Sequence, residues 1–365
     1  MYDYLIVGAG FYGATFARMA TDAGKTCLVI DARQHVAGNA YSENMQGIEV
    51  HMYGPHIFHT SNSLIWDFVN RYATFNNFRL SPKAYNNGRM YSLPFNMNTF
   101  HEMWGVVTPE QAKEKINSQT LKLTARAKNL EEEALSQVGY EVYETLIRDY
   151  TIKQWQKNPC DLPASIIRRL PIRFTYDNNY FNDLYQGIPM GNGYTGLIQN
   201  MLDGIQVELG VDYFKARDKF DALAQKVVFT GRIDEFFNYR YGALEYRTLD
   251  FKHRIFEGEN RQGCAIINYT GMCVPYTRTV EHSHFRKSGS SVSVVTTETP
   301  GLWHRDAEPF YPVNDDINDA IYNVYKQMAK STPNIIFGGR LAEYKYYDMH
   351  QVIASARHTI MELED

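Results

Sequence analysis

The 365-residue sequence is poor in cysteine and tryptophan, with four residues of each type. The cysteines, at positions 27, 160, 264 and 273, are widely scattered and form no CxxC pair, which argues against a disulfide framework. The chain also opens directly on an apolar strand instead of a basic and apolar leader. We therefore expect a reduced, cytoplasmic protein.

Long apolar runs and an excess of positive charge are also missing. No apolar run approaches the roughly 18 residues that a membrane-spanning helix needs, so we expect no integral membrane protein. The formal net charge of −4 provides no positive field for nucleic acid, although a few arginines could still hold a small phosphorylated ligand. A chain of this length predicts two or three structural modules.

Tyrosine is abundant, with 27 residues beside 20 phenylalanines. A tyrosine side chain combines apolar area with one hydroxyl, which suits a pocket for sugar or phosphate oxygens. For most of these residues, however, ordinary packing in a core or a sheet is the better interpretation.

The N-terminus has the pattern of a dinucleotide-binding unit. The apolar stretch "YDYLIV" runs into "GAGFYG", an amphipathic segment follows to Gly24, and "TCLVID" forms the next strand. Gly8, Gly10 and Gly13 are in GxGxxG register. Gly8 permits a tight turn, Gly10 lets the backbone approach a pyrophosphate, and Gly13 allows close packing of helix and strand. Asp31 can accept hydrogen bonds from ribose hydroxyls.

This unit alone leaves NAD and FAD open. A second glycine turn at Gly38-Asn39 and a further strand with a glycine pair, "NIIFGG", near the C-terminus favour FAD, since many flavoproteins close the dinucleotide fold with their last residues. A terminal helix is predicted to start at a capping box formed by Asp348 and Gln351. Its N-terminus either faces the anionic end of a reduced flavin or simply packs on the sheet.

The stretch "HMYGPHIFHT" carries His51, His56 and His59 around a Gly-Pro step, and it could be a metal site, a cluster of catalytic bases or a buried turn. A metal would need three or four converging ligands, whereas this turn offers an HxxH pair with Glu49 as the sole carboxylate candidate. We therefore predict no metal site and a structural role for His51.

Several stretches in family order show that the chain resembles prokaryotic UDP-galactopyranose mutases, which are flavin-dependent isomerases. They include "YGPHIFHT", "LPFNMNTFHEMWG", "LPASIIRRLPIRFTYDNNYFNDLYQGIP", "GALEYRTL", "VPYTRTVEH" and "FGGRLAEYKYYDMHQVI". Together they span nearly the whole chain.

The expected fold is α/β, a Rossmann-like FAD-binding domain with an inserted helical bundle and an antiparallel sheet domain. The FAD-binding domain is predicted to comprise residues 1–75, 187–235 and 330–365. The helical domain is predicted over 97–170, where apolar residues recur at helical spacing, with a mobile substrate loop near its end. The sheet domain is predicted over 76–96, 171–186 and 236–329, where aromatic and β-branched residues are frequent.

The resemblance also implies the site residues. Arg173 and Arg278 match arginines that grip the diphosphate, with the bidentate geometry of a guanidinium. The substrate set is completed by Tyr150, Trp155, Tyr185, Tyr311 and Tyr346. His56 would lie near the isoalloxazine ring and His59 would face the sugar, so these two and the two arginines form the catalytic set. The implied FAD contacts are Gly8, Gly10, Tyr12, Gly13, Asp31, Ala32, Gly38, Asn39, His56, Gly339, Arg340, Tyr346, Asp348 and Met349.

The implied activity interconverts UDP-galactopyranose and UDP-galactofuranose for a cell-surface polysaccharide. Reduced FAD would act as the nucleophile, with NAD(P)H or another reductant as electron source, and the protein would form a homodimer. Relatives act on UDP-N-acetylgalactopyranose or dTDP-fucopyranose, and His59 favours galactose because relatives that accept the N-acetyl sugar tend to carry Arg there. A flavin oxidoreductase, or a UDP-sugar sensor that keeps FAD without catalysis, would share the dinucleotide unit. Ala37 departs from the glycine that the family commonly has.

Overall fold

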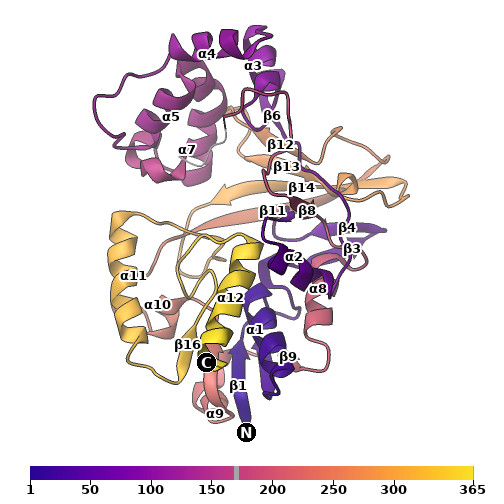
Figure 1. Ribbon diagram of the computed structural model, residues 1–365, viewed down its shortest axis with the longest axis vertical. Helices are drawn as coiled ribbons and strands as arrows, with labels where there is room; N and C mark the ends of the chain where they lie inside the picture. The colour runs from indigo at the N-terminus through magenta and orange to yellow at the C-terminus, as the bar shows by residue number, and fades with distance from the viewer. Residues whose placement is uncertain (168–171, 365) are drawn as a thin grey trace.

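The computed structural model describes residues 1–167 and 172–364. It has three parts, which Figure 1 shows one above another: a parallel sheet flanked by helices and holding both termini, a larger mixed sheet, and a group of helices at the far end. The α/β class predicted from the sequence is confirmed.

The first part is a five-stranded parallel sheet in the order β16-β10-β1-β2-β9. Its strands are β1 (Tyr2–Val7), β2 (Cys27–Asp31), β9 (Gln206–Leu209), β10 (Ala224–Phe229) and β16 (Ile335–Phe337). The strand "KVVF" pairs with the N-terminal strand, as expected, and β16 then pairs with β10. Segments from the beginning, the middle and the end of the chain therefore build one sheet.

Helices cover both faces of this sheet because its strands are apolar on both sides. On one face, Ile6 and Val29 pack with residues of α1 (Phe11–Asp22), α2 (Ser63–Asn70), α8 (Gly193–Met201) and α12 (Met349–Glu364). On the other face, Leu5 and Ile30 meet residues of α9 (Arg217–Asp221) and α10 (Ile233–Phe236).

The glycine turn between β1 and α1 has no room for larger residues at two positions. A Cβ on Gly13 would lie 2.0 Å from the carbonyl oxygen of Gly8, and one on Gly8 would lie 2.0 Å from Thr230 Oγ1. Gly8 also has a φ of +112°, which L-residues rarely adopt. At Gly10 a Cβ would meet nothing closer than Gly38 Cα at 3.9 Å, so the protein leaves space beside this residue. The tight turn at Gly8 and the close packing at Gly13 are as predicted, and the approach of a pyrophosphate to Gly10 stays a prediction.

The second part is a seven-stranded sheet in the order β15-β11-β14-β13-β12-β6-β7. Its strands are β6 (Lys83–Asn86), β7 (Arg89–Ser92), β11 (Tyr246–Glu257), β12 (Ile266–Tyr269), β13 (Arg278–Glu281), β14 (Val292–Gly301) and β15 (Tyr311–Pro312). Neighbours are antiparallel, as predicted for this domain, except β6 and β12, which run parallel and make the sheet mixed. Two separate antiparallel pairs complete the strands: the hairpin of β3 (Ser42–Met45) with β4 (Ile48–His51), and β5 (Phe58–Thr60) with β8 (Tyr185–Gly187) from a distant part of the chain.

The third part is the helical unit inserted between β7 and β8. It contains α3 (Met97–Trp104), α4 (Pro109–Asn117), α5 (Leu130–Val138), α6 (Tyr140–Val142) and α7 (Asp149–Trp155), with a π-helical turn over Tyr143–Arg148. The apolar residues that carry the helical spacing, Ala134, Val138, Val142 and Leu146, are buried in its core.

Two segments differ from the expected division. Among the described residues of 171–186, only the last two belong to a strand, and that strand pairs with β5 outside the large sheet. Helix α11 (Asp316–Ala329) falls in the range assigned to the sheet domain, yet its Tyr325 packs with Ile233 and Tyr344 of the dinucleotide unit. The buried face of this amphipathic helix packs on the dinucleotide unit, so the helix belongs to that unit and not to the sheet domain. Residues 168–171 of the predicted substrate loop lie outside the described residues.

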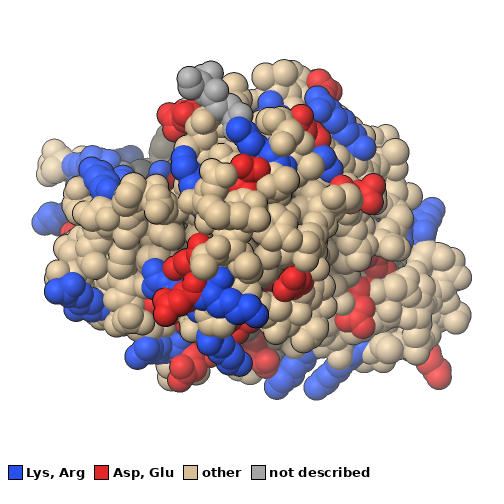
Figure 2. Space-filling view, turned by 90° about the horizontal axis from the view of Figure 1, so that it is seen from below, with Lys and Arg blue, Asp and Glu red and all other residues tan. Residues whose placement is uncertain are grey.

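No helix of the described residues is both long and apolar enough to cross a membrane. On the face seen from below in Figure 2, lysines and arginines alternate with aspartates and glutamates, so this face carries no extended area of one charge.

Candidate active site

A cavity of about 530 Å³ lies along the carboxyl ends of β1 and β2 and the N-terminus of α1. Twelve of the predicted cofactor residues line it: Gly8, Gly10, Tyr12, Gly13, Asp31, Ala32, Gly38, Asn39, His56, Gly339, Arg340 and Met349. The carboxyl ends of parallel strands beside a helix N-terminus are where doubly wound folds bind dinucleotides.

The polar groups of this first cavity suit a dinucleotide. Asp31 is held at the end of β2, where one carboxylate oxygen accepts from Ala9 N–H at 2.7 Å and the other from Arg33 N–H at 2.9 Å. The carboxylate is therefore oriented before any ribose arrives. The open space at Gly10 lies where the helix N-terminus would receive a pyrophosphate.

A second cavity of about 520 Å³ lies between the helical unit, the large sheet and the dinucleotide unit. Three residues, His56, Arg340 and Met349, line both cavities. The remaining predicted cofactor residues, Tyr346 and Asp348, line the second one. A ligand longer than one mononucleotide could therefore extend from the first cavity to the edge of the second.

Three arginines face the second cavity. Arg278 donates from Nε to Glu298 Oε2 at 2.6 Å. Burial by itself would lower the pKa of Arg278, but the charge of Glu298, the neighbouring Tyr150 and Tyr311 and the hydrogen bond to Glu298 together outweigh burial and raise it. Burial lowers the pKa of Arg247 to about 10, so this guanidinium remains charged at neutral pH. Within the described chain, neither Arg247 nor Arg340 has a carboxylate partner.

Aromatic rings support these cations. The Arg247 guanidinium lies 4.5 Å from the ring centroid of Trp155 and 5.6 Å from that of Tyr311. Tyr311 and Tyr346 stack at 5.2 Å, and Arg340 lies over both rings. Cation–π contacts and burial keep the guanidinium groups in place without neutralising them. Against these three guanidinium groups stand the buried carboxylate of Glu298 and, in the cavity lining, that of Asp348.

Neutral groups complete the second cavity. Burial raises the pKa of Tyr150 to about 12, so its hydroxyl stays protonated and can donate. At the junction of the cavities, burial and the neighbouring His51 lower the pKa of His56 to about 3, so this imidazole is neutral. His56 Nδ1 lies 2.7 Å from Gly54 O, and the backbone N–H of His56 donates to His51 Nδ1 at 3.0 Å. His51 itself is buried, which agrees with a structural role.

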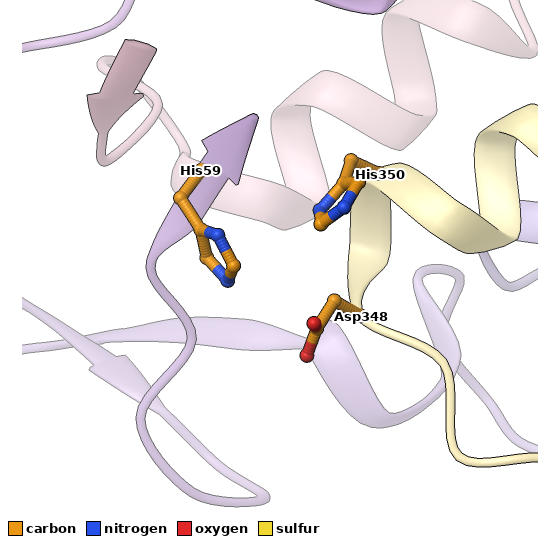
Figure 3. Close-up of side chains that lie close together, drawn as sticks. All are labelled: His59, Asp348 and His350. Atoms are coloured by element: carbon orange, nitrogen blue, oxygen red, sulfur yellow. The ribbon is translucent and has the colours of Figure 1, made fainter. Parts of the chain in front are cut away.

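His59, Asp348 and His350 gather at the end of the second cavity, from β5 and from the start of α12 (Figure 3). One ligand atom from each lies within 4.8 Å of the others, which is close enough for a metal ion. However, a cation would lie at a helix N-terminus, where the helix dipole disfavours it. Gln351 caps this helix by accepting from Asp348 N–H at 2.9 Å, so one half of the predicted capping box forms.

The second cavity brings together most of the predicted substrate residues but leaves two outside. It is lined by Tyr150, Trp155, Arg278, Tyr311 and Tyr346, as well as His56 and His59.

Arg173 is absent from the lining because its guanidinium donates to the carbonyl oxygens of Asn179 and Tyr180. Tyr185 is absent because its ring stacks on Trp66 at 5.3 Å. The structure therefore does not bring Arg173 and Tyr185 into the cavity, and their roles as substrate ligands stay predictions.

Sequence reasoning missed Arg247 and Glu298. Arg247 belongs to the quoted stretch "GALEYRTL", and its place on β11 beside the cavity could have been suspected from that stretch. Glu298 gives no local signal, because its pairing with Arg278 depends on the register of β13 with β14.

Comparison with known proteins agrees with this geometry. Residues 145–346 match the family described as UDP-galactopyranose mutase, and residues 6–72 match the NAD(P)-binding Rossmann-like domain. The chain is 40% identical to a dTDP-fucopyranose mutase of Escherichia coli, covering 98% of this chain and 97% of that protein. It is also 40% identical to a probable UDP-galactopyranose mutase of Klebsiella pneumoniae, covering 99% and 94%.

The crystal structure of a reduced UDP-galactopyranose mutase has the same fold, with a TM-score of 0.77 at 14% identity over 100% of this chain and 94% of that one. Two similar sequences thus carry different substrate names, and the shared feature is a mutase acting on a nucleotide sugar. The chain belongs to the UDP-galactopyranose mutase family.

Proposed function

We propose that this protein interconverts UDP-galactopyranose and UDP-galactofuranose with reduced FAD as its cofactor. The observation that carries the proposal is the group of three arginines at the second cavity, where Arg247 and Arg340 have no carboxylate partner among the described residues and Arg278 stands beside them. A pyrophosphate dianion would pair with these cations, because guanidinium groups offer forked donors to phosphate oxygens.

The residues of the first cavity fit FAD. The oriented carboxylate of Asp31 would hold the ribose of its adenosine, and the open backbone at Gly10 would receive the pyrophosphate. His56, Arg340 and Met349 would hold the flavin where the two cavities meet. When bound and reduced, FAD supplies the electron-rich nitrogen that this isomerisation needs.

The chain's own residues would bind and orient the nucleotide sugar. Trp155 and Tyr150 would pack against the uracil ring, and the arginines would hold the diphosphate and stabilise UDP when it leaves. Neutral His56 would lie beside the flavin without adding charge. Arg173 remains a predicted phosphate ligand, although its guanidinium is bound to backbone carbonyls in this structure.

Galactose is the sugar that the polar end of the cavity favours. His59 and Asp348 line this end, and among the described residues Nδ1 of the neighbouring His350 is buried without a hydrogen-bond partner. A site with polar groups prefers a sugar rich in hydroxyls, because a deoxy sugar would leave some of them unpaired. dTDP-fucopyranose, a 6-deoxy sugar, is the second candidate, since a dTDP-fucopyranose mutase is as similar to this chain as a probable UDP-galactopyranose mutase.

The test is turnover by the dithionite-reduced holoprotein. UDP-galactopyranose, dTDP-fucopyranose and UDP-N-acetylgalactopyranose are supplied separately, and the furanose products are separated by chromatography. We expect kcat/KM to be highest for UDP-galactopyranose and no reductant to be consumed with turnover. A higher kcat/KM for another nucleotide sugar would overturn the assignment of UDP-galactopyranose as the substrate. Stoichiometric consumption of reductant would indicate an oxidoreductase, and binding without isomerisation would indicate a sensor.

A further inference from the structure

Asp183 connects two segments beside the sugar end of the second cavity. Its Oδ2 lies 2.6 Å from His59 Nδ1, and its Oδ1 accepts from Ser61 Oγ at 2.8 Å. His59 and Ser61 belong to β5 and the turn after it, whereas Asp183 precedes β8, the partner strand of β5. The carboxylate therefore holds the His59 ring by one edge.

The face of the same ring is also fixed. Phe181 stacks on the His59 ring with centroids 3.8 Å apart and an interplanar angle of 13°. Contacts on the ring edge and the ring face together leave the imidazole one orientation. Among the described residues, Nε2 of His59 has no hydrogen-bond partner, and His59 lines the second cavity, so Nε2 can meet a ligand there.

The charge state of Asp183 decides which nitrogen of His59 carries the proton. Burial alone would raise the pKa of Asp183, but the hydrogen bonds from His59 and Ser61 lower it overall, so the group is a carboxylate at neutral pH. A carboxylate only accepts hydrogen bonds, and Nδ1 must therefore be the protonated nitrogen. In the neutral imidazole, Nε2 then has no proton and is an acceptor.

We propose that Asp183 is a positioning residue that fixes His59 in its Nδ1–H tautomer, so that Nε2 accepts a hydrogen bond from a hydroxyl of the sugar. The inference rests on the proposed function and specifies the chemistry of its sugar site. An acceptor at this place selects a donor, so a sugar hydroxyl fits, whereas an acetamido carbonyl there would face a second acceptor. Asp348, close to the same ring, is a further acceptor for the hydroxyls (Figure 3).

The kinetic test uses a substitution that reverses the tautomer of His59. In Asp183→Asn the side-chain amide can donate to Nδ1, which moves the imidazole proton to Nε2 and turns the acceptor into a donor. We expect kcat/KM for UDP-galactopyranose to fall about tenfold to a hundredfold, with UDP affinity and flavin content unchanged. Asp183→Glu, which keeps the carboxylate, should recover most of the loss. The matched control is Ser61→Ala, which removes the other side-chain hydrogen bond to the same carboxylate and should leave kcat/KM nearly unchanged.

A double variant separates positioning from a general structural effect. If Asp183 acts through His59, the variant Asp183→Asn/His59→Gln should be no slower than His59→Gln alone. Losses that add in full would show that Asp183 acts independently of His59 and would overturn the proposal.

The tautomer of His59 can also be determined directly, without measuring enzyme turnover. Nitrogen-15 NMR of the oxidised holoprotein should show a protonated Nδ1 and an unprotonated Nε2 for His59, identified by the signals that His59→Gln lacks. A protonated Nε2, or an imidazolium at neutral pH, would overturn the proposal. The expected tautomer in a protein that isomerises no nucleotide sugar would instead overturn the proposed function and leave the role of Asp183 in place.

Discussion

Removal of Arg278 should damage both activity and stability, and the structure allows the two effects to be separated. The Arg278 side chain is 25% exposed and its partner Glu298 is 2% exposed. Glu298 Oε1 is buried with no hydrogen bond, so among the described residues the only hydrogen bond to this carboxylate comes from Arg278. In Arg278→Met the methionine keeps apolar bulk but leaves Glu298 unpaired.

Breaking one side of a buried ion pair costs about 3–5 kcal/mol. Because Arg278 is partly exposed, we expect the lower limit, a loss of about 3 kcal/mol in the free energy of unfolding at pH 7. The loss depends on pH in a defined direction. Burial raises the pKa of Glu298, and without Arg278 it rises further, so the folded state holds its proton more tightly than the unfolded state does. The destabilisation should therefore be small at pH 5 and should grow as the pH increases.

The measurement is urea unfolding of the FAD-loaded protein, followed by tryptophan fluorescence at pH 5 and pH 8. The double variant Arg278→Met/Glu298→Gln should recover most of the stability while isomerase activity stays low, because Arg278, the proposed phosphate ligand, is still absent. Arg148→Met is the matched control, since this arginine is 42% exposed beside Glu144 and should cost under about 1 kcal/mol. Equal stability of the single and double variants at pH 8 would refute the reasoning.

The remaining predictions concern the glycine turns, a second arginine and buried histidines. Gly13→Ala should cost about 1–3 kcal/mol and lower the flavin content measured by absorbance, because the new Cβ meets Gly8 O at 2.0 Å. Ala37→Gly should raise the free energy of unfolding by about 0.5–1 kcal/mol, since Ala37 has a φ of +74° and relief of strain exceeds the added entropy of the unfolded chain; a loss in urea unfolding would contradict this. Arg247→Met should weaken UDP binding in calorimetry about tenfold or more while flavin stays bound. Burial lowers the pKa of both His282 and His56, so the unfolded state takes up these protons first and stability should fall as the pH drops below 6.5. The fall should be smaller in His282→Gln, because only His56 of this pair then contributes, and an unchanged fall would contradict the role of His282.

The dinucleotide unit was predictable because its signals are local. Gly8, Gly13 and Asp31 lie within one strand-turn-helix-strand pattern, and each occupies the place its chemistry requires. The helical unit followed from the periodicity of residues such as Val138 and Val142. These features depend on neighbours in the chain, which a sequence displays directly.

The second cavity was predictable only through the resemblance, because its residues come from distant segments. Glu298 meets Arg278 through the pairing of two strands, and Asp183 meets His59 across 124 positions. Arg173 shows the limit of such transfer, since a motif identifies a residue but does not fix the hydrogen bonds of its side chain in a given conformation.

The parallel sheet is completed only when β16 pairs with β10, and the last helix then packs against α1. During synthesis, the ribosome must therefore release β16 and α12 before the pocket beside α1 can close. A nascent chain lacking these two elements would display the apolar face of α1 to chaperones and proteases. An affinity tag placed after α12 consequently selects translation products that contain both elements.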